Sequence, residues 1–545
     1  MKKKSAFRII LPVILITIIA IIAFFSSSWY LNRYVKTRLQ DQFREQTNGQ
    51  YSLSINSLRM NLLTQSVTFS DVHIKPEKPA PGTATYKVYS SRLNLLGINV
   101  IGILRGKYVK VDVIELEKPS LTIVQGMPLK NEIKDTTDFS IYKLIKSFAE
   151  SVSVNRFEIS NFDFKLFSGP DEPSPSLHSD NNHFKLKNLY IGESTEKLPG
   201  LFEADSISLI MNNFSYTTSD SLYTFDVKRM EISYIDSLLW VDSVKVVPNY
   251  SKRRFAEIAG KQTDRFNVFA GNLLFRKIDL RKMFEHHSLI SDALDVTDFS
   301  LTAFRDKNDE RMYDTPESIQ HLILNAQVYL KIDTINLDRS FIAYEEVAPG
   351  KIKPGRITFN DINATFTGIT NDSSLIARGR DLVLRANCNL MDEGKLFATY
   401  VFPMNTDQMV FKCDGFLTNM SLTALNKMIE PTVGVSIKEG HIDTLSFSFN
   451  AGETSSKGRM KFLYHNLKLQ MPEVKNENKK LKDQLMIFVA NTFVLKESNP
   501  TGKNEPREAN MYYVRNKQRF MFHYTWKTIF SGLRETVGMP EPKTN

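Results

Sequence analysis

Hydrophobic and polar residues alternate with a period of two in segment after segment of this chain from Tyr51 onward. Strict alternation over many segments is typical of strands with one apolar face and one solvated face. The clearest segments are 53–55, 67–69, 109–113, 162–166, 207–211, 223–227, 328–332, 382–390, 445–449 and 460–464. We therefore predict a mainly β body built from half-buried antiparallel strands.

Helical periodicity is confined to a few short stretches. We predict helices over residues 31–50, 140–150, 420–430, 478–495 and 525–537, and we expect Pro431 to end the third of them. Polar stretches at 168–183, 305–317 and 497–510 predict loops, and Asp392-Glu393-Gly394 predicts a hairpin turn.

Repeated strands without a clear boundary leave two architectures open. One is a long curved antiparallel sheet whose apolar face is partly open as a groove. The other is a set of tandem β-sandwiches, in which each apolar face packs on a second sheet. We expect segments at 1–30 (cytoplasmic stub and transmembrane helix), 31–50 (juxtamembrane helix), 51–130 (N-terminal β unit), 131–370 (middle β-rich region), 371–475 (C-terminal β module) and 476–545 (helices and an aromatic strand).

The N-terminal segment predicts a membrane anchor. Three lysines precede an apolar run that is long enough, at roughly 20 residues, to cross a bilayer as a helix. The anchor residues are Ile9, Leu15, Ile18, Ile22 and Phe25, followed by Trp29 and Tyr30 at the expected depth of an interfacial aromatic belt. The alternative is a secretory signal cleaved near Ser26-Ser27-Ser28. Both interpretations place the body outside the cytoplasm.

The basic net charge of +10 is concentrated at the two ends of the chain. Residues 1–50 carry +6 and residues 471–545 carry +5, so the middle of the chain is close to neutral. A nucleic-acid-binding body needs a basic stripe along its working face. We therefore expect no nucleic-acid partner and assign the basic ends to an anionic membrane surface.

Residues with catalytic or metal-binding spacing are scarce. The chain has no Gly-x-Ser-x-Gly, phosphate-loop, His-Glu-x-x-His or Cys-x-x-Cys motif. The pair His286-His287 and the group His178, Asp180 and His183 are interpreted as surface residues, not as metal ligands. Cys388 and Cys413 are interpreted as small buried hydrophobes too far apart for a disulfide. We expect no enzyme activity, no cofactor and no metal.

The stretch from Arg519 to Trp526 is unusually aromatic. We predict that Phe520, Phe522, Tyr524 and Trp526 share one face of a strand, which is followed by a helix. One interpretation is a foot that contacts a membrane or an envelope partner. The favoured interpretation is a cap on the open edge of the sheet.

Two stretches of the chain resemble AsmA-like envelope proteins. The first is an anchor followed by YSLSINSLRMNLLTQSVTFSDVHI at 51–74. The second and stronger one runs from Cys413 to Met471. Its ordered parts are Leu422-x-x-Leu425-Asn426, Pro431, Gly440-His441-Ile442-Asp443, Leu445-x-Phe447-x-Phe449, Gly458-x-Met460 and Tyr464-x-x-Leu467.

The resemblance implies a single-pass protein of the bacterial inner membrane whose body lies in the periplasm. It further implies an apolar β-groove, related to bridge-like lipid-transfer proteins, that binds or conducts phospholipids and supports outer-membrane homeostasis. Burying each acyl methylene contributes about 0.8 kcal/mol, so lipid binding needs no polar motif. The expected lipid contacts are Phe225, Leu330, Leu384, Cys388, Phe447, Phe449 and Phe462. The alternative function is a non-enzymatic envelope scaffold built from closed sandwiches.

Overall fold

The computed structural model describes most of residues 36–539. The gaps are single residues at 38, 42 and 46 and the segments 62–63, 79–82, 100–107, 127–141, 143–148, 196–201, 309–315 and 471–494. The predicted anchor from Ile9 to Tyr30 lies outside the described residues, as do nearly all of the predicted helices 140–150 and 478–495. Among the residues that are described, no helix has both the length and the apolar character needed to cross a bilayer.

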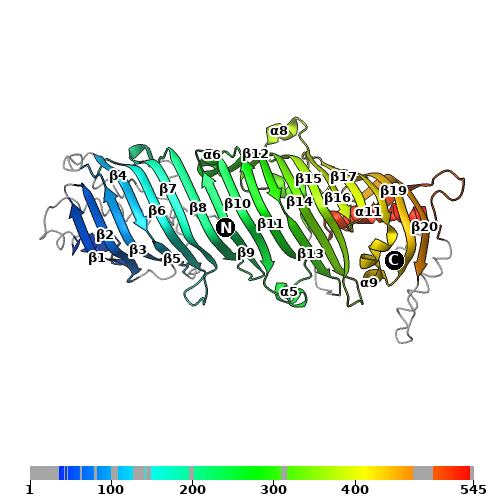
Figure 1. Ribbon diagram of the computed structural model, residues 1–545, viewed down its shortest axis with the longest axis horizontal. Helices are drawn as coiled ribbons and strands as arrows, with labels where there is room; N and C mark the ends of the chain where they lie inside the picture. Colours follow the sequence, from blue (N-terminus) through cyan, green and yellow to red (C-terminus); the bar gives the residue numbers. More distant parts are fainter. Residues whose placement is uncertain are drawn as a thin grey trace. The chain divides into compact units, whose positions relative to one another are not determined.

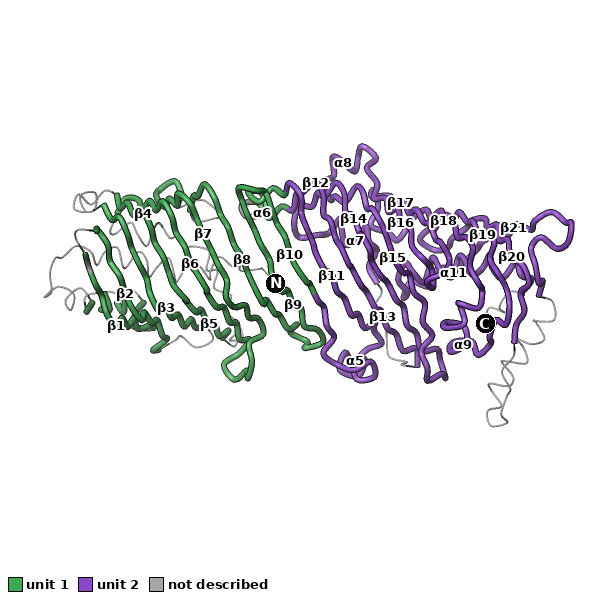
Figure 2. Tube along the Cα trace, in the orientation of Figure 1, with its two compact units in different colours: residues 1–244, 278–288 green, residues 245–277, 289–545 purple. Residues whose placement is uncertain are grey.

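Strands dominate the fold, as predicted. Within the described part of the chain, 21 strands are assigned to one hydrogen-bonded sheet, so the alternative of tandem sandwiches is wrong for these residues. The chain divides into two compact units (Figure 2): residues 1–244 with 278–288, and residues 245–277 with 289–545. This division falls inside the predicted middle region 131–370.

Within the described residues, the strands of the first unit follow one another across the sheet in chain order, with β4 and β5 end to end in one position (Figure 1). They are β1 (Tyr51–Asn61), β2 (Ser66–Pro76), β3 (Thr85–Leu96), β4 (Tyr108–Glu117), β5 (Ser120–Val124), β6 (Ser151–Phe167), β7 (Leu177–Ile191), β8 (Ser206–Thr217), β9 (Tyr223–Ser233) and most of β10 (Leu238–Pro248), with the short helices η2 (Glu193–Thr195) and α6 (Leu280–His286). The apolar face of β1–β7 is buried, and Leu39 and Phe43 from the helical turns within 36–45 belong to that core.

The second unit continues the same construction. Its strands are β11 (Arg265–Arg276), β12 (Ser288–Thr297), β13 (Ser300–Asp306), β14 (Tyr329–Val347), β15 (Gly355–Thr370), β16 (Leu382–Leu390), β17 (Gly394–Phe402), β18 (Phe411–Ser421), β19 (Ser436–Ala451), β20 (Ser455–Gln470) and β21 (Glu508–Val514). Its helices are α5 (Lys252–Ala259), α7 (Ile319–Leu324), α8 (Ser373–Ala377), η3 (Leu422–Leu425), α9 (Asn426–Val433) and α11 (Met521–Val537).

The sheet is mixed, whereas purely antiparallel pairing was predicted. In the first unit, β4 and β5 are consecutive parts of one interrupted strand, and both run parallel to β6. In the second unit, β12 and β13 both pair with β11, and β13 runs parallel to β14. Each parallel pair is joined by a connection of more than 20 residues, the length that a crossover requires.

Residues with a left-handed backbone conformation interrupt many of the strands near their middle. Asparagine and aspartate tolerate this conformation better than other non-glycine residues. They and a few others adopt it at Asp71, Asn161, Asn181, Asn188, Asn213, Ser243, Arg339, Asp361, Asn419 and Asn466. Register shifts accompany several of them, for example between Asn360 and Asn363. Such bulges bend a strand and increase its twist.

Three local predictions need correction. The predicted loop 168–183 is shorter, because β7 begins at Leu177. Within this part of β7, the buried side chains of Ser179 and Asn182 are hydrogen-bonded, with Ser179 Oγ donating to Asn182 Oδ1 at 2.7 Å. Helix α9 continues past Pro431 to Val433 and ends where Gly434 adopts φ 85°. The predicted aromatic strand at 520–526 is wrong, because α11 begins at Met521. The helix predicted over 525–537 and the hairpin at Asp392–Gly394 are confirmed.

Replacing Phe449 by alanine tests the core of the second unit. The Phe449 side chain is 1% exposed and its ring lies 6.0 Å from that of Phe411. Truncation leaves a cavity, so we expect the free energy of unfolding to fall by about 3–5 kcal/mol. Urea denaturation of the purified protein measures this. The control Phe416→Ala removes a ring that is 42% exposed on the other face, and a loss as large as that of Phe449→Ala would contradict this description of the core.

Candidate functional site

The strand register of the second unit separates an apolar face from a polar face. One row of directly paired residues crosses the strands as Ile335, Phe366, Leu384, Tyr400, Cys413 and Phe449. The neighbouring row is Asn336, Thr365, Arg385, Thr399, Asp414 and Ser448. Because paired residues lie on the same side of a sheet, the first row defines the apolar face and the second defines the polar face.

A lane of small side chains runs across the apolar face beside the first row. It comprises Ala364, Ala386, Ala398 and Gly415, which are paired in succession on β15–β18. Larger side chains flank this lane: Leu384 and Tyr400 on one side, Cys388 and Leu396 on the other. Three interstrand spacings of about 4.8 Å give the lane a length of about 14 Å. We call these four residues the small-residue lane.

The lane is closed at its β18 end. Gly415 is paired with Phe447, and a β-carbon placed on Gly415 would lie only 2.1 Å from the Phe447 ring. The ring therefore lies flat over the glycine, and any side chain at position 415 would displace it.

Exposure of the apolar face changes along the second unit. Phe366, Leu384, Ala386, Leu396 and Ala398 are all half-buried. On β18 and β19 the same face is closed, with the side chains of Cys413, Leu417 and Leu445 buried. The strands β15–β17 thus present an apolar surface that the described parts of the protein leave partly open.

Helix α11 closes the apolar face at the C-terminal end of the sheet, where Figure 1 shows it in red. Tyr524 is 1% exposed; its ring lies 5.9 Å from Phe411, and its hydroxyl donates to the Gly452 carbonyl at 3.0 Å. Ser456 Oγ and Thr528 Oγ1 are hydrogen-bonded at 2.6 Å. These contacts hold α11 on the apolar face of β18–β20.

This closure bears on three of the predicted lipid contacts. Phe447, Phe449 and Phe462 are 8%, 1% and 3% exposed. They lie on the apolar face, as predicted, but they pack in the protein core and offer almost no surface to a ligand. The alternating pattern identifies the face of a residue; it does not identify which part of that face a distant helix covers.

Helix α11 also caps the free edge of the sheet. The backbone N–H of Tyr512 donates to Ser531 Oγ at 3.0 Å, and that of Asn510 donates to Glu535 Oε2 at 3.1 Å. Both donors belong to β21, which pairs with β20 on its other side. Unpaired strand edges invite pairing with other chains, so these bonds protect the sheet. They agree with the favoured interpretation of the C-terminal aromatic region as a cap.

The other predicted contacts lie on open or peripheral surface. Leu384 and Cys388 are half-buried on the apolar face of β16, next to the small-residue lane. Leu330 is the second residue of β14, and its backbone N–H donates to Asn371 Oδ1, so it lies at the end of the strand. In the first unit, Phe225 is half-buried on β9, paired with Tyr216 at a ring distance of 6.1 Å.

The two cysteine thiols are free and lie in apolar surroundings. Burial raises the pKa of Cys388 to about 11 and, as the largest of several causes, the pKa of Cys413 to about 12. Both thiols are therefore protonated at neutral pH and poor nucleophiles. Cys388 is paired with Leu396 and Cys413 with Tyr400, four residues further along β17.

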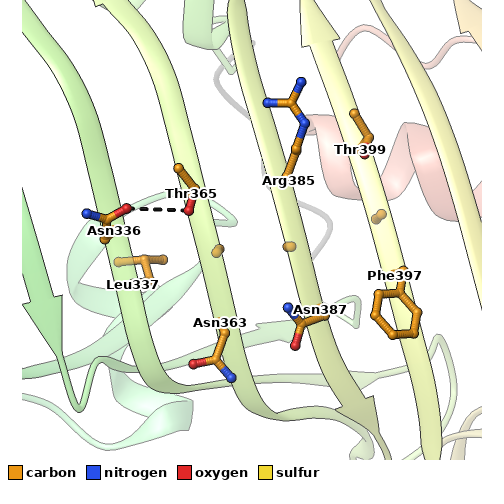
Figure 3. Close-up of a pocket in the computed structure, with 11 residues that line it drawn as sticks. Asn336, Leu337, Asn363, Thr365, Arg385, Asn387, Phe397 and Thr399 are labelled. Atoms are coloured by element: carbon orange, nitrogen blue, oxygen red, sulfur yellow. Dashed lines mark hydrogen bonds between the residues drawn. The ribbon is translucent and has the colours of Figure 1, made fainter.

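The polar face carries a shallow depression of about 420 Å³ (Figure 3). Asn336, Thr365, Arg385 and Thr399 line it from four neighbouring strands, and Thr365 Oγ1 donates to Asn336 Oδ1 at 3.4 Å. Phe397, which also lines it, is 49% exposed. The side chains lie side by side along the strands and no nucleophile faces a base, so we assign no reaction to this surface.

Within the described residues, no group of three or more His, Cys, Asp or Glu side chains is arranged to hold a metal ion. His178, Asp180 and His183 lie on β7, and His287 caps the C-terminus of α6 in a left-handed conformation.

A group of charged residues that the sequence did not reveal lies where α11 begins. Arg305 binds Asp264 through two bonds of 2.6 and 2.7 Å, and Lys307 binds Glu346 at 2.7 Å. Tyr344 donates to Glu346 at 2.7 Å. These residues come from the start of β11, β13 and β14, so only the folded sheet brings them together.

The side chains of α11 complete this group. The ring of Phe522 lies 6.0 Å from Tyr344 and 5.8 Å from Phe359. Burial, together with the nearby cations Lys527, Lys307, Arg519 and Arg305, lowers the pKa of His523 to about 3. Burial also lowers the pKa of Lys527. The region is therefore rich in positive charge and partly shielded from water.

Comparison with protein-family models found no match to this chain, and comparison with curated proteins found none either.

The pKa of His523 predicts a loss of stability in acid. An unfolded histidine has a pKa near 6.5, and the folded value is lower, so protonation favours the unfolded state. The stabilisation is complete above about pH 6.5 and is lost as the pH falls toward about 3. We expect urea midpoints to fall more steeply between pH 7 and pH 4 for the wild type than for His523→Gln. If the urea midpoints of the wild type and of His523→Gln fall in parallel with pH, the prediction is wrong and the pKa of His523 is not lowered by folding.

Proposed function

We propose that the protein binds the acyl chains of membrane lipids on the half-exposed apolar face of β15–β17, as a membrane-anchored, non-enzymatic protein of the bacterial envelope. The observation that carries the proposal is the exposure of this face. Leu384, Leu396 and Phe366 are half-buried on one side of a sheet whose other side is polar. Soluble proteins rarely leave large apolar patches uncovered unless something binds there.

The small-residue lane supports an elongated apolar ligand. The methyl groups of Ala386 and Ala398 project less far from the sheet than the side chains of Leu384 and Leu396. An extended hydrocarbon chain that crosses the strands therefore fits between the two leucines. Each methylene buried there contributes about 0.8 kcal/mol, and no polar partner is needed. Burial raises the pKa of Cys388 beside the lane to about 11, so its thiol is a neutral, apolar contact for such a chain at pH 7.

The resemblance of residues 51–74 and 413–471 to AsmA-like proteins adds to this proposal. It supplies the envelope location, the phospholipid class and a role in lipid transport or outer-membrane homeostasis. In the first unit, the half-buried rings of Phe225 and Tyr216 are further candidate contacts for an acyl chain.

Introducing a charge on the proposed binding face tests the function. We expect Leu384→Asp to reduce the lipid that co-purifies with the protein at least about fivefold, because an acyl chain cannot pack on a carboxylate without desolvating it. Because Leu384 is half-buried, the fold should survive, which circular dichroism and a thermal melt will show. The measurement is lipid mass spectrometry of the purified full-length protein.

Two variants serve as controls. Phe397→Asp places the same charge on the polar face of the adjacent strand and should leave the bound lipid unchanged. Phe449→Asp buries an unpaired charge and should unfold the second unit. A wild-type protein that carries no lipid, or a Leu384→Asp variant that retains its lipid in full, would leave only the scaffold role.

A further inference from the structure

The flank of α11 that adjoins the open apolar face combines aromatic rings with a lysine that lacks a carboxylate partner. Phe522 and Trp526 are 39% and 37% exposed, and the rings of Trp526 and Phe530 are tilted to each other with their centres 5.8 Å apart. These three residues are spaced four apart and therefore lie on one side of the helix. Phe522 contacts Phe359, which is on the apolar face of β15 five residues before Ala364.

Lys527 supplies the excess positive charge of this region. The carboxylates of Asp264 and Glu346 are already bound, by Arg305 and Lys307 respectively. Among the described residues Lys527 makes no ion pair, and its ammonium lies 5.8 Å from the centre of the Phe530 ring. Burial, followed by the nearby cations Lys307 and Arg534, lowers the pKa of Lys527, and only Glu346 raises it. A partly buried cation without a counterion is costly, and an anionic ligand would remove that cost.

The neighbouring groups are arranged to attract an anion as well. Helix α11 has no acidic residue in its first turn, and Phe520 provides no side-chain cap, so the positive end of the helix dipole is not neutralised by its own side chains. Burial, and after it the surrounding cations, lowers the pKa of His523, which lies four residues before Lys527, so its ring is neutral at pH 7 and adds no charge to the site.

We propose that Lys527, on the helix that also carries Phe522 and Trp526, binds the phosphate of a phospholipid headgroup whose acyl chains lie on the apolar face of β15–β17. This inference rests on the proposed function and assigns the place where the phosphate of its phospholipid ligand binds. The distance along β15 from Phe359 to Ala364 is about 15 Å, which an acyl chain spans. Aromatic rings beside the cation resemble the composition of proteins at a membrane interface, where ring edges face headgroups.

The test compares two lipids with the same acyl chains. Fluorescent phosphatidylglycerol and the matching fluorescent diacylglycerol are titrated into the full-length protein in detergent. The variants are Lys527→Met, which keeps the apolar stem of the side chain, and Lys395→Met, which removes an exposed lysine from β17. We expect Lys527→Met to weaken phosphatidylglycerol binding about tenfold, because a charge-assisted contact is lost, and to leave diacylglycerol binding unchanged. Lys395→Met should change neither.

Each other outcome is decisive. If Lys527→Met leaves phosphatidylglycerol binding intact, or weakens both lipids equally, the headgroup site is refuted while acyl-chain binding stands. If the wild type binds neither lipid, the proposed function itself fails. If millimolar inorganic phosphate displaces phosphatidylglycerol from the wild type and binds in a Lys527-dependent way without lipid, the site is one for free phosphate and the headgroup assignment is overturned.

Discussion

A single-layered sheet with one apolar face is stable in water only if something covers that face. In the first unit, the cover over β1–β7 is protein, and Leu39 and Phe43 are part of it. In the second unit, α11 covers β18–β21 and seals Phe449 and Phe462 beneath Tyr524 and its neighbours. Strands β15–β17 are covered only in part: Phe522 of α11 contacts Phe359 on β15, whereas Leu384, Ala386, Leu396 and Ala398 remain half-exposed. The functional proposal follows from that difference in cover.

Helix α11 has two roles in this account. Its buried side closes the core and its side chains Ser531 and Glu535 protect the edge strand. Its other flank carries Phe522, Trp526 and Lys527 next to the open surface. A cap that is required for folding thereby also supplies the polar end of an amphipathic site. One consequence is that deleting the helix would remove stability and the headgroup site together, so single substitutions are the cleaner test.

The period-two pattern predicted correctly which face of the sheet many side chains lie on. It did not predict which parts of the apolar face other segments of the protein cover. It placed Leu384 and Cys388 on the apolar face, and the register agrees. It also placed Phe447 there without revealing that its ring lies over Gly415, because that contact depends on the exact register between β18 and β19, which η3 and α9 separate in the chain. The alternation of Phe520, Phe522, Tyr524 and Trp526 suggested a strand, although Phe522, Trp526 and Phe530 repeat every four residues and indicate a helix. The charged group around Glu346 joins three strands and a helix, so no local pattern could predict it.

The most direct test of the account is to map where a bound acyl chain lies. A phospholipid with a photoreactive group at the end of one acyl chain is bound to the full-length protein, crosslinked by light and located by mass spectrometry of the peptides. We expect labels on the apolar face of β16 and β17, at Leu384, Ala386, Leu396 or Ala398. Labels confined to Phe397 and Asn387 on the polar face, or no labelling above that of a detergent-only control, would contradict it.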